Sequence, residues 1–210
     1  MAGVIQEISS GKNNKNRDIL NALPLCMILV AGSILSWFKI AAIDLVFEAA
    51  AFGIAEIVLC LTAVYGLLSS KDKKWAFFIP AAGAAVLTFI RPVQILNGFL
   101  SFLNICIYSW NEKYEDGVRL FGNVQATEQN LFLYSLVFLL MLAALFWYLV
   151  SVKACTRISL IALVLFVPEI VLGRSSLFGA VLMLTSITGV WLFAFHAGSF
   201  GRRTGWTIVT

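Results

Sequence analysis

Long apolar stretches separated by short polar connections dominate this chain. A helix that crosses the hydrocarbon core of a membrane needs about 20 mostly apolar residues, and several stretches qualify. Because unpaired backbone groups are costly in lipid, and because the stretches are too long and continuous for barrel strands, we expect each to be helical. The pattern predicts six crossings, at Ile19–Phe38, Ala50–Leu68, Trp75–Ile90, Leu131–Val150, Ile158–Leu172 and Leu177–His196.

The stretch Pro92–Asn111 has a different pattern. Its polar residues recur at steps of three and four, which places them on one face of a helix. They are Gln94, Asn97, Ser101, Asn104, Tyr108 and Asn111. We expect an uncharged amphipathic helix that lies along the outer membrane surface or extends the third crossing. The alternative is that it crosses the bilayer, which makes seven crossings and moves the later connections to the opposite sides.

Composition and charge agree with a membrane protein and orient it. Apolar residues make up 60% of the chain and charged residues 12%, against roughly a quarter charged in soluble domains. Ten of the fifteen basic residues fall on one side if the N-terminus is inside. This bias predicts a multi-pass protein of the cell membrane with both termini in the cytoplasm. Since the basic residues are split among short connections, we expect no nucleic-acid partner.

The sequence therefore predicts an all-α, polytopic transmembrane helical bundle of about six crossings plus one amphipathic interfacial helix. Residues 1–18 form a polar cytoplasmic tail, and residues 19–198 form the bundle with an outer polar loop at 111–130. A basic cytoplasmic segment follows at 199–210. The outer loop is too short to make a catalytic domain.

Two acidic residues inside predicted crossings are the candidates for chemistry. Glu56 lies within the second crossing and Glu169 follows Pro168 within the fifth. Ionisable residues at such depth are costly and often functional, so each is a candidate proton or cation site. Arg174 lies about a turn beyond Glu169 and offers a neutralising partner. We expect no catalytic residue, cofactor or metal site, because the single His196 has no suitable ligands or triad partners on its side of the membrane.

Small and aromatic residues suggest how the helices pack. Ala49, Gly53 and Glu56 follow one another on one helix face, and Gly179 and Gly189 lie in the last crossing. Such residues permit close helix approach, within one chain or between chains. Five tryptophans lie near predicted span ends and are expected to be interfacial anchors. They are Trp37, Trp75, Trp110, Trp147 and Trp191.

The second half of the chain carries a family resemblance, over residues 96–198. Its features are the segment Leu96–Asn104, then Trp110–Tyr114, a short polar loop and the apolar run from Leu131. A basic break at Lys153–Arg157, the span that contains Pro168 and the turn Gly173–Ser176 follow. In order and spacing these features resemble the N-terminal membrane region of bacterial transglutaminase-like membrane proteins, especially those of Firmicutes.

The resemblance implies a role as a membrane anchor. In that family the bundle precedes an extracytoplasmic domain whose cysteine, histidine and aspartate act on proteins or peptides, and the given sequence contains no such domain. The expectation is a truncated or stand-alone copy of the anchoring region, to which no catalytic residue carries over.

Two functional hypotheses follow. The first is a non-enzymatic anchor or scaffold that positions an extracytoplasmic transglutaminase-like domain or a partner protein in or outside the membrane. The second is a small proton- or ion-coupled transporter or channel component that uses Glu56 and Glu169, with the polar stripe from Gln94 to Asn111 as part of its pathway. The sequence does not indicate whether the chain self-associates.

Overall fold

The structure is a computed structural model that describes residues 2–196 except 44, 70–72, 123, 125, 153 and 175. The side chains of residues 2–21, 45, 73 and 193–196 also lie outside the description. Every regular element of the described chain is a helix. The elements are α1 (Ala2–Ala41), α2 (Leu45–Leu68), the short 3₁₀ helix η1 (Lys73–Phe77), α3 (Phe78–Ile90), α4 (Pro92–Tyr114), α5 (Glu128–Ser151), α6 (Cys155–Leu172) and α7 (Leu177–His196).

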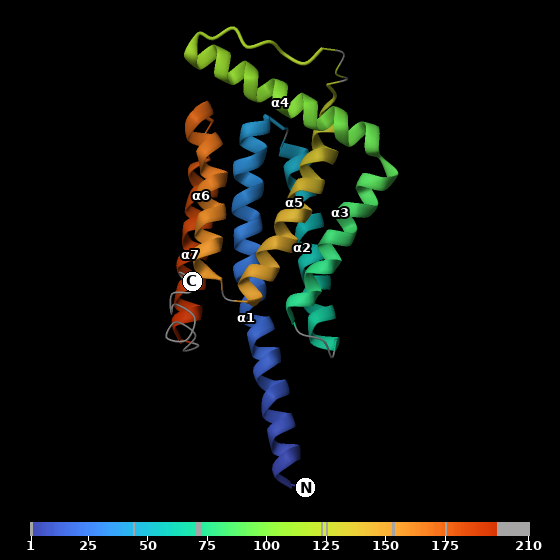
Figure 1. Cartoon of the computed structure of the whole chain (residues 1–210), viewed down its shortest axis with the longest axis vertical. Helices are drawn as coiled ribbons and strands as arrows, with labels where there is room; N and C mark the ends of the chain where they lie inside the picture. Colours follow the sequence, from blue (N-terminus) through green and yellow to red (C-terminus); the bar gives the residue numbers. More distant parts are fainter. Residues whose placement is uncertain are drawn as a thin grey trace, which may run out of the picture.

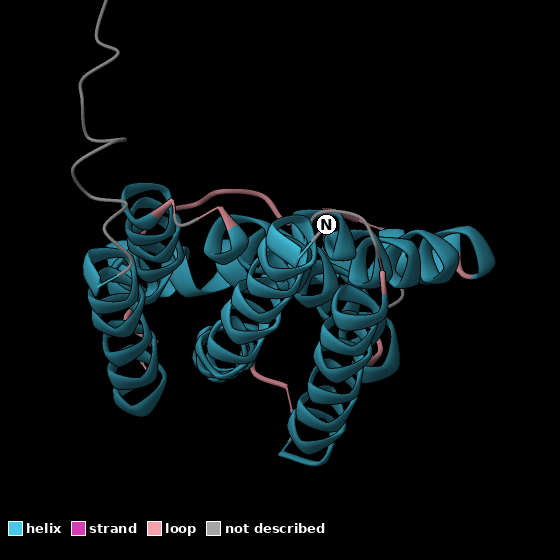
Figure 2. Cartoon of the chain, turned by 90° about the horizontal axis from the view of Figure 1, so that it is seen from below, coloured by secondary structure: helices cyan, strands magenta, loops and turns pink. Residues whose placement is uncertain are grey.

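Six helices of the described chain run alongside one another, and α4 lies across one end of this bundle (Figure 1). Seen from below, the bundle helices point towards the viewer and α4 runs behind them (Figure 2). Helix α1 begins, and α7 ends, at the end of the bundle away from α4 (Figure 1). The all-α bundle with one additional helix at its surface is thus confirmed.

The direction of α4 is set where α3 ends. Arg91 leaves the helical region, with φ −130° and ψ 47°, and Pro92 is the first residue of α4. Proline has no N–H to continue the hydrogen bonding of α3, and its ring disfavours a helical conformation in the residue before it. The chain therefore turns and starts a new helix. By length and composition α4 would suffice to cross a membrane, but its crosswise position argues against the seven-crossing alternative.

The helix bounds differ from the prediction mainly at the N-terminus. Helix α1 begins at Ala2, so the backbone of the predicted polar tail is helical and continuous with the first crossing. Its apolar part, Ala22–Ala41, is one of the stretches long enough to span a membrane. The segment predicted at 199–210 lies outside the described residues.

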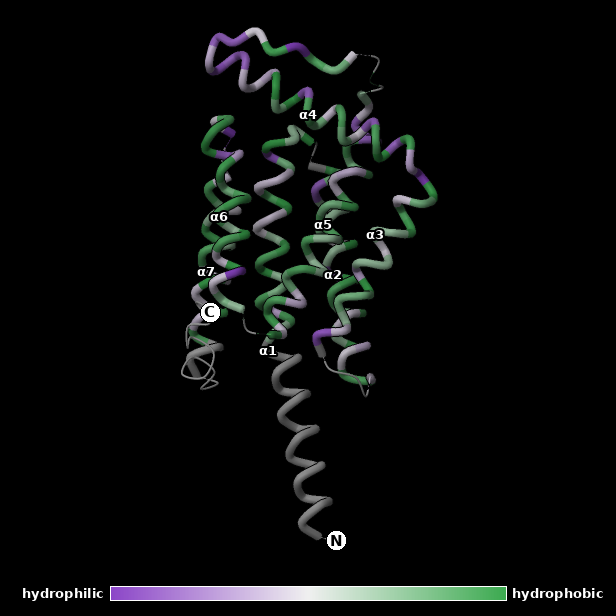
Figure 3. Tube along the Cα trace, in the orientation of Figure 1, coloured by the Kyte–Doolittle hydropathy of each residue, from purple (hydrophilic) through white to green (hydrophobic). Residues whose placement is uncertain are grey.

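The core of the bundle forms around α1 and α5. Buried side chains from these helices, together with residues of α2, α6 and α7, make one continuous apolar cluster that includes Leu29, Phe38, Phe146 and Trp147. Hydrophobic residues extend along the bundle, while hydrophilic residues gather on α4 and on the loop that follows it (Figure 3). Polar chemistry is therefore concentrated at the end of the bundle that carries α4.

Candidate functional site

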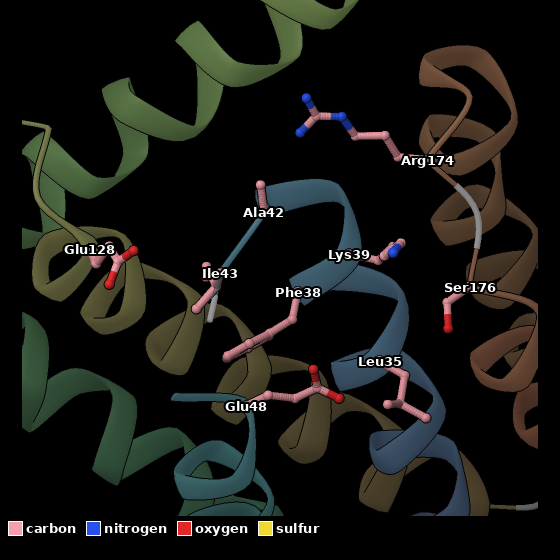
Figure 4. A pocket seen from close by; sticks show the side chains of 9 residues that line it. All are labelled: Leu35, Phe38, Lys39, Ala42, Ile43, Glu48, Glu128, Arg174 and Ser176. Atoms are coloured by element: carbon pink, nitrogen blue, oxygen red, sulfur yellow. The ribbon is translucent and has the colours of Figure 1, made fainter. Parts of the chain in front are cut away.

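A cavity of about 740 Å³ opens at the end of the bundle next to α4. Its walls come from the end of α1, the start of α2, the start of α5 and the connection between α6 and α7 (Figure 4). The lining residues are Leu35, Phe38, Lys39, Ala42, Ile43, Glu48, Glu128, Arg174 and Ser176. This is the place in the described chain where charged side chains from distant segments meet.

The cavity has two positive and two negative side chains, each placed where its charge suits a helix end. Lys39 lies in the last turn of α1, and Glu48 and Glu128 lie in the first turns of α2 and α5. The guanidinium of Arg174 donates from Nη1 to the carbonyl oxygen of Ile40, at the end of α1, over 3.3 Å. Helix dipoles favour cations at C-termini and anions at N-termini. The formal charges of the four side chains, two positive and two negative, therefore balance.

A second cavity of about 430 Å³ lies directly beneath α4 and shares Ala42, Glu128 and Arg174 with the first. Ser101 and Asn104 of the predicted polar stripe line it. Tyr108 of the stripe lines it too, so the structure brings together four of the residues singled out in the sequence: Arg174, Ser101, Asn104 and Tyr108. The Ser101 hydroxyl donates to the Asn97 carbonyl oxygen at 2.7 Å, so it is already satisfied within α4.

The asparagines of the stripe hold the outer loop against α4. Asn104 donates to the carbonyl oxygen of Phe121 at 3.1 Å and accepts from its N–H at 2.7 Å. Asn111 makes the same pair of bonds with Val118, at 2.8 and 3.2 Å. Seven helical residues rise about 10 Å, as do three extended residues, so the two spacings match. The amide groups of Asn104 and Asn111 therefore bind the loop to α4.

Helix α4 is itself attached to the bundle near its C-terminus. The Lys113 ammonium donates to the carbonyl oxygens of Ile170 and Val171 at 3.1 and 2.8 Å, and the Tyr114 hydroxyl donates to Val171 at 3.3 Å. These carbonyls belong to the last turn of α6, where a cation also suits the helix dipole. One end of α4 is therefore fixed to α6.

The first half of α4 packs against α5 and α1. A Cβ added at Gly98 would overlap the backbone carbonyl of Asn130 in α5, so only glycine permits this approach. Phe102 stacks on Trp37 of α1, with ring centroids 4.4 Å apart, and the Trp37 indole N–H donates to Ser135 of α5 at 2.9 Å. Further along the same face, Gln94 keeps a buried Oε1 without a hydrogen-bond partner among the described residues.

Glu169 is buried beside the larger cavity, with 2% of its surface exposed. Its Oε2 accepts from the backbone N–H of Ser176 at 3.0 Å, at the start of α7, and its Oε1 has no partner among the described residues. The ion pair suggested with Arg174 is not formed in this part of the chain, because Arg174 reaches α1 instead. Glu169 therefore joins the end of α6 to the beginning of α7.

Glu56 lies apart from this site. It is exposed on the outward face of α2 and lines neither cavity. The two intramembrane acids, Glu56 and Glu169, are consequently not brought together on one pathway.

Sequence reasoning missed Lys39, Glu48 and Glu128 as parts of the site. The signal was present, because all three lie in connections that the predicted orientation places on the outer side, Lys39 and Glu48 between the first two crossings and Glu128 just before the fourth. Charges at the ends of several crossings on one side of a membrane must face one another if those helices are neighbours. What was lacking was the order in which the helices pack.

Comparison of the chain with known proteins found no matching family model, no matching curated protein and no matching solved structure. The resemblance to the membrane region of transglutaminase-like proteins therefore stays a prediction.

Proposed function

We propose that this membrane-embedded helical bundle is a non-catalytic anchor or scaffold that holds an extracytoplasmic partner, with a transglutaminase-like domain as the expected partner. The observation that carries the proposal is the attachment of α4 and its loop across one end of the bundle. Contacts to α1, α5 and α6 fix this layer, which we call the platform (residues 92–122). A platform fixed to several helices suits docking better than gating.

The exposed surface of the platform supports a docking role. Several of its apolar and aromatic side chains remain exposed, and charged residues lie among them. The exposed large ones are Val93, Leu96, Phe99, Tyr108, Trp110, Tyr114, Val118, Leu120 and Phe121. Aromatic side chains are enriched at protein interfaces. The positive-inside bias places this end outside the cell membrane, with both termini in the cytoplasm.

Labelling of single cysteines tests this orientation. In a version with Cys26, Cys60, Cys106 and Cys155 replaced, we introduce Ser70→Cys, Gln125→Cys or Ser199→Cys and treat intact cells with an impermeant thiol reagent. The proposal expects labelling of Gln125→Cys alone. Labelling of Ser199→Cys as well contradicts six crossings. Labelling of Ser70→Cys and Ser199→Cys, but not of Gln125→Cys, means that the orientation is the inverse of the proposed one.

Photo-crosslinking tests the docking role. A photoreactive amino acid replaces the exposed Phe121 on the platform or, as a matched control, the exposed Leu163 in the middle of α6. The proposal expects position 121 to crosslink, in intact cells, to an extracytoplasmic protein that mass spectrometry identifies as carrying a transglutaminase-like domain. Crosslinks to lipid alone at both positions contradict it.

The Oε1 of Glu169, which has no hydrogen-bond partner among the described residues, favours a second candidate, proton- or ion-coupled transport. The anchor proposal expects Glu56→Gln and Glu169→Gln to leave any proton flux into reconstituted vesicles unchanged. Flux that is present in the original protein and lost in Glu169→Gln supports transport and contradicts the anchor as the sole function.

A further inference from the structure

The face of α2 turned away from the bundle contains an acidic residue at its centre. The opposite face of α2 is buried against the other helices through Ala51, Ala55, Leu59 and Ala63. The outward face is exposed along its whole length and consists of Val46, Ala49, Ala50, Gly53, Glu56, Ile57, Cys60, Leu61, Val64, Tyr65 and Leu68. In a membrane this outward face meets lipid unless another protein covers it.

Glu56 lies close to the middle of α2, eleven residues after Leu45 and twelve before Leu68. At 1.5 Å per residue it is about 17 Å from either end of the helix, which is the centre of a hydrocarbon layer about 30 Å thick. Ionisable side chains at that depth almost always pair with another polar group. The described lysines and arginines lie at helix ends, in connections or in the first part of α1, before its apolar stretch Ala22–Ala41. Since none of them lies near the middle of an apolar stretch, we look for the partner of Glu56 in another chain.

The residues around Glu56 suit close contact with another helix. Ala49, Gly53, Glu56 and Cys60 follow at steps of four, three and four, the spacing of a seam between two helices. A Cβ added at Gly53 would meet nothing within 4 Å. Small side chains on both sides of Glu56 let a second backbone approach until its polar group is within reach.

We propose that a second copy of this chain covers the face, with the two α2 helices parallel about a twofold axis along the membrane normal. In such an interface each residue near the axis meets its own copy, so Glu56 meets Glu56 at the same depth. A carboxyl group that holds a proton donates to an oxygen of the other, and two copies thus satisfy each other. A different protein would need a matching polar residue at that depth, which makes the second copy the simplest complement.

Cys60 makes the proposal testable in native membranes. It is exposed one turn from Glu56 on the same seam, whereas Cys26 and Cys155 are buried and Cys106 is half-buried. Oxidation with copper phenanthroline is expected to give a disulfide-linked dimer that Cys60→Ser abolishes. The matched control combines Cys60→Ser with Leu163→Cys, an exposed site in the middle of α6, and is expected to give no dimer above that of Cys60→Ser.

Substitutions at Glu56 and Gly53 distinguish the contribution of hydrogen bonding from that of close helix approach. In vesicles, association of the fluorophore-labelled protein is measured by single-molecule photobleaching over a range of protein-to-lipid ratios. Glu56→Leu is expected to weaken association roughly tenfold, and Glu56→Gln to restore most of it, because an amide also donates and accepts. Gly53→Leu is expected to weaken it by its bulk. Monomers at every ratio, or association that ignores all three variants, would overturn the proposal, as would oxidation that links Cys60 only to another protein.

Discussion

The glycines of two helix faces, one between α1 and α7 and one on the outward side of α2, have opposite surroundings. Where α1 crosses α7, a Cβ at Gly179 would lie 3.0 Å from the Gly32 carbonyl oxygen, and a Cβ at Gly32 would lie 2.9 Å from that of Gly179. On the outward face of α2, a Cβ at Gly53 would meet nothing within 4 Å. Gly53 and Gly179 look alike in the sequence. A pattern of small residues therefore indicates that another helix can approach closely, but not which helix does so.

The same substitution at both glycines gives the largest expected difference. Gly179→Leu forces side-chain atoms into the backbone of α1, and overpacking of this kind costs about 3 kcal/mol of the free energy of unfolding. Gly53→Leu, the matched control, is expected to cause no loss of monomer stability and a gain of up to about 1 kcal/mol, because leucine favours a helix more than glycine does and a Cβ there meets nothing within 4 Å. Titration with SDS in mixed micelles measures both. Equal losses would mean that the outward face of α2 is packed in the monomer after all.

A smaller loss of stability is expected at Gly98, the close contact between the platform and α5. Gly98→Ala places a Cβ on the Asn130 carbonyl and is expected to loosen α4 locally at a cost of about 1 to 3 kcal/mol. The native, half-buried Cys106 of α4 then reacts with a thiol reagent roughly tenfold faster. Gly117→Ala serves as the control, since a Cβ there meets nothing within 4 Å. An unchanged rate in Gly98→Ala would show that α4 does not depend on this contact.

Much of the fold was predictable from the long apolar stretches, because a segment that crosses lipid must form a long uninterrupted helix. The polar stripe also predicted the amphipathic character of α4 correctly. The start of α1 at Ala2 was not predicted, because a polar stretch can be a tail or a helix and only its continuity with an apolar helix distinguishes them. Trp147, expected as an interfacial anchor, is fully buried, since proximity to a span end does not indicate which way a side chain faces.

The site was only partly predictable, because it depends on which helices are neighbours. Arg174, Ser101 and Asn104 do meet at the cavities, but Lys39, Glu48 and Glu128 join them through packing that no local pattern encodes. The expected partner of Arg174 was Glu169, one turn away in sequence, and Arg174 instead donates to Ile40. A long, flexible arginine side chain has several acceptors within reach, and the tertiary fold decides among them.

The smallest expected effect is that of Gly53→Ala on the stability of the monomer. It is also the most discriminating, because a gain is expected where Gly179→Leu and Gly98→Ala cause a loss. Glycine within a helix is less stable than alanine by about 0.5 to 1 kcal/mol. Since nothing opposes a Cβ at position 53, Gly53→Ala is expected to raise the stability of the monomer by that amount in dilute detergent, where self-association is absent. A loss of stability under these conditions would mean that α2 already has a neighbour there. A gain in the monomer, combined with weaker association in vesicles, would mean that Gly53 is suited to a contact between chains at the expense of its own helix.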